Sequence, residues 1–130
     1  GEEDGLIQTD VTIVAVTVDE TGVITDCVID AVQAKANFDS QGQLLTDLTV
    51  PVPSKNELGA DYGMGSISGI GKEWYEQIAF LENYLKENGS DALTFDDQGR
   101  AQNADVLSGC TISIEQYVEA YDQAKADAKA

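Results

Sequence analysis

Two runs of β-branched residues, joined by a short turn sequence, constrain the fold of this chain more than any other feature. The first run, at residues 10–18, includes Val11, Ile13, Val14, Val16 and Val18, and the second is VITDCVIDAVQ at 23–33. Such residues favour strands. The DETG connector places Asp first and Gly fourth, which suits a turn that closes a hairpin. We predict a long β-hairpin.

The same turn pattern recurs as DSQG at 39–42 and DDQG at 96–99. Phe38 and the segment QLLTDLTV at 43–50 predict a third strand, which PVP ends because proline cannot donate to a ladder. These features together predict an antiparallel meander. The turns do not indicate calcium binding, because an EF-hand loop needs further oxygen ligands and a late Glu.

Two amphipathic stretches predict the main helices. The first spans about residues 72–88, with a core-facing stripe at Trp74, Ile78, Leu81 and Leu85 and a stop at Gly89. The second begins near residue 114, where Ser113 and Gln116 form a capping box, and frays after residue 125. We therefore expect an α+β fold: an antiparallel meander sheet with two main helices packed on it, in one domain at 8–130. Residues 1–7 would be a disordered or cloning-derived tail.

The charge balance excludes several classes of function. The chain has 24 acidic and 7 basic residues, a net charge of -17 and no histidine. Nucleic acid and anionic lipid surfaces would be repelled, and histidine-based triads and metal sites are ruled out. Cys27 and Cys110 are interpreted as two buried thiols or as a single bridge. No apolar run is long enough to span a membrane, and the opening GEEDG suggests that an upstream signal or anchor was removed.

A glycine-rich segment, SKNELGADYGMGSISGIG at 54–71, lies between the predicted sheet and the first helix. Its GMGSISG core has one residue too many for a dinucleotide fingerprint and follows no βαβ strand. Two interpretations stay open: the glycines let backbone amides approach a ligand at a helix start, or the segment is a flexible crossing from sheet to helix.

The stretch DVLSGCTISIEQY at 105–117 contains a hydroxyl without a predicted structural role. Ser113 is assigned to the helix cap, whereas Thr111 lies just outside it. Gly109 and Cys110 are small, so a bulky partner could reach Thr111, and the following helix start favours an anion such as phosphate. These are local conditions for a phosphoester.

DVLSGCT, at residues 105–111, resembles the D-x-x-[ST]-G-A-T signature of FMN-binding domains. Together with KNELGADYGM and SGIGKEWYEQ, it makes residues 8–124 similar to the repeats of Gram-positive surface lipoproteins used in flavin-based extracellular electron transfer. By position, Asp105, Ser108 and Gly109 match the motif and Thr111 matches the flavin acceptor. Cys110 departs from the pattern, which most often has Ala there.

The resemblance implies an extracellular or cell-surface electron carrier, not a catalyst, with FMN linked covalently through its phosphate to Thr111. A flavin transferase would attach the FMN, a membrane electron donor would reduce it, and an external acceptor would take the electrons. Tyr62, Trp74 and Tyr75 are the expected neighbours of the isoalloxazine. No cluster of Lys or Arg accompanies residues 105–113, which favours a covalent link over tight noncovalent binding of a dianion. The alternative is a flavin-free binding or spacer repeat of a cell-surface lipoprotein.

Overall fold

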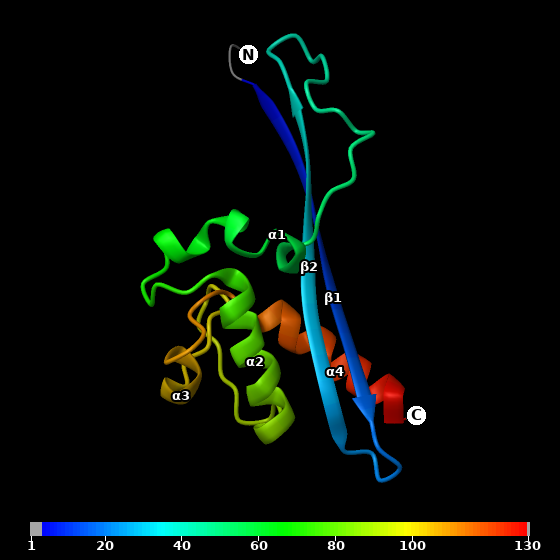
Figure 1. Ribbon diagram of the computed structural model, residues 1–130, viewed down its shortest axis with the longest axis vertical. Helices are drawn as coiled ribbons and strands as arrows, with labels where there is room; N and C mark the ends of the chain where they lie inside the picture. The colour runs from blue at the N-terminus through cyan, green and yellow to red at the C-terminus, as the bar shows by residue number, and fades with distance from the viewer. Residues whose placement is uncertain (1–3, 130) are drawn as a thin grey trace.

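One long hairpin forms the sheet of the computed structural model, which describes residues 4–129. Strands β1 (Gly5–Val18) and β2 (Ile24–Phe38) pair antiparallel, from Gly5 opposite Phe38 to Val18 opposite Ile24. The predicted hairpin is confirmed (Figure 1). Because β1 begins at Gly5, residues 5–7 belong to the strand and not to the predicted tail, whereas residues 1–3 lie outside the described residues.

Two helices cover one face of the hairpin. Helix α2 (Trp74–Asn88) packs on β2, and α4 (Glu115–Lys129) packs on β1. The predicted α2 stripe is buried, and the helix ends at Gly89, whose positive φ of 73° is one that glycine adopts readily. The core combines this stripe with side chains from β2, the segment at 101–114 and α4, including Ile29, Val106 and Tyr121. None of the described helices is both long and apolar enough to cross a membrane.

Short helical turns replace the open loop expected at 54–71. They are α1 (Lys55–Leu58), η1 (Gly59–Tyr62) and η2 (Met64–Ser66). A separate short helix, α3 (Ala104–Leu107), precedes Thr111. Ser54 caps α1 by accepting a hydrogen bond from the N–H of Glu57 at 3.2 Å. The half of the hairpin that carries the chain start extends beyond the helices, together with the segment that follows β2 (Figure 1).

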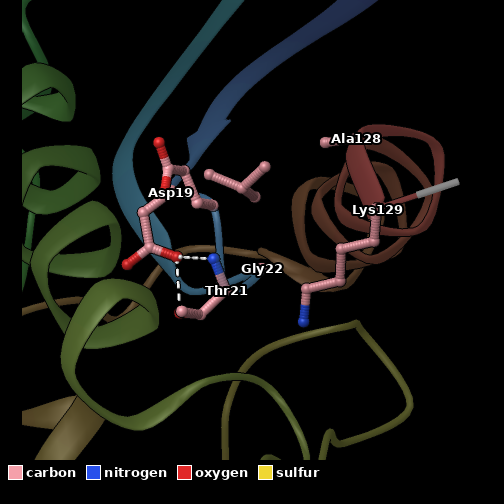
Figure 2. A pocket seen from close by; sticks show the side chains of 7 residues that line it. Asp19, Thr21, Gly22, Ala128 and Lys129 are labelled. Atoms are coloured by element: carbon pink, nitrogen blue, oxygen red, sulfur yellow. Dashed lines mark hydrogen bonds between the residues drawn. The ribbon is translucent and has the colours of Figure 1, made fainter.

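The three D-x-x-G sequences form the same turn. At the hairpin tip, Asp19 Oδ1 accepts a hydrogen bond from the N–H of Thr21 at 2.8 Å (Figure 2). It also accepts from the N–H of Val23 at 3.0 Å, and Gly22 has a φ of 84°. Hydrogen bonding, first from the Thr21 hydroxyl, lowers the pKa of Asp19. The side chain of Lys129 lies beside Gly22, so α4 continues to the hairpin tip, past the point at which fraying was expected (Figure 2).

The third strand predicted at 43–50 is wrong. Only an isolated bridge between Phe38 and Leu44 follows the second D-x-x-G turn. The Thr46 hydroxyl accepts a hydrogen bond from the N–H of Asn37 at 2.7 Å, so a side chain takes a β2 backbone donor. The Asp47 carboxylate accepts from the N–H of Thr49, which bends the backbone locally. The α+β class is confirmed, but the meander is reduced to one hairpin.

Candidate functional site

The motif residues run from α3 into the tight turn that follows it, before α4. Asp105 Oδ1 accepts a hydrogen bond from the N–H of Val106 at 3.0 Å, and the Ser108 hydroxyl donates to the carbonyl of Asp105 at 2.8 Å. The N–H of Cys110 donates to the carbonyl of Val106 at 2.8 Å. Asp105 and Ser108 therefore hold the turn that presents Thr111.

Gly109 fits against the ring of Phe80 on α2. A Cβ atom at Gly109 would lie 2.2 Å from Phe80 Cδ2, far closer than carbon atoms approach one another. The backbone of Gly109 has no positive φ, so its need for glycine comes from this close approach. The turn can lie flat on α2 only because position 109 has no side chain.

Cys110 is fully buried and free, as is Cys27, so the interpretation as two buried thiols is confirmed and the bridge is wrong. Burial raises the pKa of Cys110 to about 11, and burial likewise raises that of Cys27 to about 11. A thiol that stays protonated and buried is a poor nucleophile. The departure from the family pattern therefore adds no reactive group next to Thr111.

Gln77 of α2 connects Thr111 to the glycine-rich segment. Its side chain is fully buried, and its Oε1 atom accepts hydrogen bonds from the N–H of Thr111 at 2.9 Å and from the Thr111 hydroxyl at 3.4 Å. Its Nε2 atom donates to Ser68 Oγ at 3.2 Å and to the carbonyl of Lys72 at 3.0 Å. Sequence reasoning missed Gln77. The available signal was a polar residue three positions after Trp74, on the same face as the apolar stripe.

The Thr111 hydroxyl is only weakly engaged. Its distance of 3.4 Å to Gln77 Oε1 exceeds the usual 2.5–3.0 Å of O–H···O hydrogen bonds, and Thr111 is neither fully buried nor fully exposed. The backbone N–H of Thr111, at 2.9 Å, makes the stronger contact with the same oxygen. The backbone thus fixes the residue while the hydroxyl stays available.

The capping box predicted for Ser113 and Gln116 is wrong. The Ser113 hydroxyl donates to the carbonyl of Gln98 at 2.7 Å, and the N–H groups of Ile114 and Glu115 donate to the carbonyl of Gly99 at 2.8 and 3.0 Å. The third D-x-x-G turn supplies these acceptors, so a distant turn and not a local side chain satisfies the start of α4. Ser113 still has a structural role, which separates it from Thr111.

The three aromatic residues predicted beside a flavin occupy different environments. Trp74 has 1% of its surface exposed and packs edge-to-face on Tyr117, with ring centroids 6.1 Å apart. Tyr62 is partly buried, and both Tyr62 and Trp74 lie against the ammonium group of Lys55. Tyr75 is exposed. The structure therefore brings Tyr62 and Trp74 together around Lys55, which sequence reasoning did not single out.

Within residues 4–129, no group of three or more acidic or cysteine side chains is arranged to hold a metal ion. The site at Thr111 consists instead of a hydroxyl on a glycine-bearing turn and a buried amide that fixes its backbone. Comparisons with known protein families, curated proteins and solved structures found no match.

Proposed function

We propose that this chain is an extracytoplasmic electron-transfer domain that carries FMN linked covalently through its phosphate to Thr111. The observation that carries the proposal is the weakly bonded Thr111 hydroxyl on a turn whose neighbouring residues are Gly109 and Cys110. Apart from Cys110, residues 105–111 follow the order of the D-x-x-[ST]-G-A-T pattern that they resemble. FMN would supply reversible two-electron chemistry, and the protein would hold it at the cell surface.

The local geometry fits a phosphoester at Thr111. Ester formation exchanges the O–H bond of Thr111 for an O–P bond, while the pyrophosphate P–O bond of a flavin dinucleotide donor breaks and the departing mononucleotide takes up the proton. The only hydrogen bond lost is the 3.4 Å contact to Gln77, whereas the backbone contact at 2.9 Å is kept. The site would therefore change little on modification, and Gln77 would continue to position the residue that anchors the flavin.

The packing around Thr111 also favours access from one side. Gly109 and Phe80 close the α2 side of the turn, and the Cys110 side chain is buried in the core. Neither Gly109 nor the buried Cys110 thiol offers a second group to which the flavin phosphate could be attached in place of the Thr111 hydroxyl. In this proposal Thr111 anchors the flavin, Gln77 positions Thr111, and Gly109 allows the turn to pack against Phe80.

Co-expression with a flavin transferase tests the proposal. The intact chain should gain the mass of one FMN less one water, and Thr111→Ala should abolish that gain. Ser113→Ala is the matched control, because it removes a nearby hydroxyl that the structure gives a structural partner, and it should be modified like the wild type. An intact chain that gains no mass beside a transferase active on a known substrate would refute the proposal.

The alternative of a flavin-free binding module is favoured by a different observation, the surroundings of Lys55. This side chain is buried at a cavity wall and does not contact Thr111 through any recorded hydrogen bond among residues 4–129. A ligand at Lys55 would not require flavin attachment, so the two functions can be tested separately.

A further inference from the structure

Lys55 is the one buried cationic side chain among residues 4–129, with 9% of its surface exposed. Its Nζ atom lies 5.0 Å from the centroid of the Tyr62 ring and 5.3 Å from that of the Trp74 ring, within the range of cation–π attraction. The ion pairs in this part of the chain, Lys86 with Asp26 and Arg100 with Asp96, do not include it. A chain with 24 acidic residues thus holds its most buried cation with aromatic rings and not with a carboxylate.

This arrangement leaves the ammonium donors of Lys55 available. An ammonium group has three donors and no acceptor, and aromatic faces offset only part of its desolvation cost. Among the described residues, Glu73 Oε2 is the one buried side-chain oxygen or nitrogen that lacks a hydrogen-bond partner. Lys55 Nζ also lacks such a partner but is not buried as an atom, so solvent can reach it. Its remaining donors require an acceptor that enters from outside the core.

Lys55 forms part of the wall of two neighbouring cavities. One, of about 400 Å³, lies between the helix-facing side of the hairpin and the first turn of α4, where Gln33, Gln116 and Tyr117 join Lys55 in its lining. The other, of about 390 Å³, contains Tyr62. Both volumes fall within the range of small-ligand sites. The first cavity surrounds a cation with amide and hydroxyl groups.

The first cavity also contains one carboxylate, that of Asp10. Its two oxygens accept hydrogen bonds from the Gln8 amide at 3.0 and 3.2 Å. With one cation and one anion in its wall, the cavity is close to neutral although the whole chain carries -17. This local balance allows an anionic group of a small molecule to approach Lys55, which the acidic surface elsewhere would repel.

We propose that this cavity binds the carboxylate or phosphate group of a small molecule. Lys55 supplies the charge-assisted hydrogen bond, and the amides of Gln33 and Gln116 donate from the flanking walls. The Gln33 amide is available as a donor, because it is the oxygen of that side chain that accepts from the Tyr62 hydroxyl, at 3.4 Å. The site is independent of Thr111 and extends beyond the proposed flavin attachment.

Tryptophan fluorescence tests this proposal directly. Trp74 is the only tryptophan of the chain, and its ring contacts the Lys55 ammonium group. The whole chain, without flavin, would be titrated at constant ionic strength with acetate, succinate and inorganic phosphate. At least one of these probes should give a saturable change in Trp74 emission at millimolar concentration. Lys55→Met, which keeps the apolar stem, should weaken that binding about tenfold or more, because a hydrogen bond to a charged group is lost.

Lys72→Met is the matched control. It removes the same charge near the start of α2 from an exposed side chain outside both cavities, and it should bind like the wild type. Saturation by carboxylates alone or by phosphate alone would support the site and identify its ligand group. The absence of saturation with all three probes would overturn the proposal, as would equal weakening by Lys55→Met and Lys72→Met.

A second variant covers the case in which Lys55→Met does not fold. Gln116→Ala changes an exposed side chain on α4, on another wall of the cavity, and circular dichroism should show an unchanged fold. Binding should weaken severalfold, because one donor is removed while Lys55 stays in place. Wild-type affinity in a folded Gln116→Ala variant would exclude this cavity as the binding site.

Discussion

At the residue scale, the Thr111 turn depends on the absence of a side chain as much as on the hydroxyl. The Phe80 ring occupies the space in which a Cβ of residue 109 would lie, so the turn and α2 approach one another at backbone distance. Asp105 and Ser108 fix the same turn through local hydrogen bonds. Gly109 therefore allows the turn to pack against α2, and this packing positions Thr111.

Gly109→Ala should destabilise the fold by about 1–3 kcal/mol, because the added methyl forces the Phe80 ring or the turn to move. Denaturation in urea measures this change. Gly69→Ala is the control, because no atom lies within 4 Å of a Cβ built there and its φ is not positive, and it should change stability by about 0.5 kcal/mol or less. Equal effects of the two substitutions would contradict the assigned contact, whereas recovery in Gly109→Ala with Phe80→Leu would confirm it.

The sequence located the Thr111 turn but not the residues that hold it from a distance. The motif is local, and its residues run from α3 into the turn that follows it. Gln77 lies 34 positions from Thr111, and Lys55 meets Trp74 only after the chain has folded through α1 and η1. Nothing in the local spacing indicates such pairs. A polar residue within an apolar stripe was the single available signal, and its partner could not be inferred from it.

At the element scale, side chains protect the outer edge of β2. The N–H of Ile29 donates to Glu82 Oε2 at 2.7 Å, and the carbonyl of Ile29 accepts from the Asn56 amide at 2.9 Å. Farther along, Thr46 occupies the N–H of Asn37. Exposed strand edges promote pairing with other chains, and these contacts limit it. The third strand was mispredicted because a D-x-x-G turn reverses the chain whether or not a paired strand follows it.

Glu82→Gln should make the fold more stable than the wild type at neutral pH, with a smaller difference in mild acid. Burial raises the pKa of Glu82 above its usual value, despite the hydrogen bond from Ile29. The folded state therefore holds its proton more tightly than the unfolded state does. Stability from this group is complete below the unfolded pKa and is lost as the pH rises through the folded pKa. Glutamine keeps an acceptor for the N–H of Ile29 without the buried charge.

Thermal unfolding of the wild type and Glu82→Gln at several pH values between about 4 and 8 measures this effect. This interval covers the pH range over which a carboxyl group with a raised pKa titrates. Glu87→Gln, on the exposed surface of the same helix, is the control and should show no such convergence in acid. A stability difference between Glu82→Gln and the wild type that is constant with pH would show that the Glu82 charge is not the cause.

At the scale of the whole molecule, the net charge of -17 over 130 residues acts against compactness. Like charges repel more strongly in the folded state, where they are closer together, than in the expanded chain. Few ion pairs offset this repulsion in the described residues: Lys86 with Asp26 at 3.7 Å and Arg100 with Asp96 at 2.9 Å. Core burial and the hairpin must therefore stabilise the fold against its own electrostatic field.

Salt should consequently raise the thermal midpoint of unfolding by several degrees between about 0.01 M and 0.15 M NaCl, as the Debye length falls from about 30 Å to about 8 Å. The first value is comparable to the size of a small domain, so most acidic pairs interact at low salt and few do at the higher concentration. The two ion pairs weaken under the same conditions, but surface pairs contribute little. KCl should match NaCl, since screening depends on ionic strength and not on the cation. A midpoint that stays constant or falls with NaCl would mean that local attractive pairs outweigh the net repulsion, and a response to only one of the two salts would indicate specific ion binding.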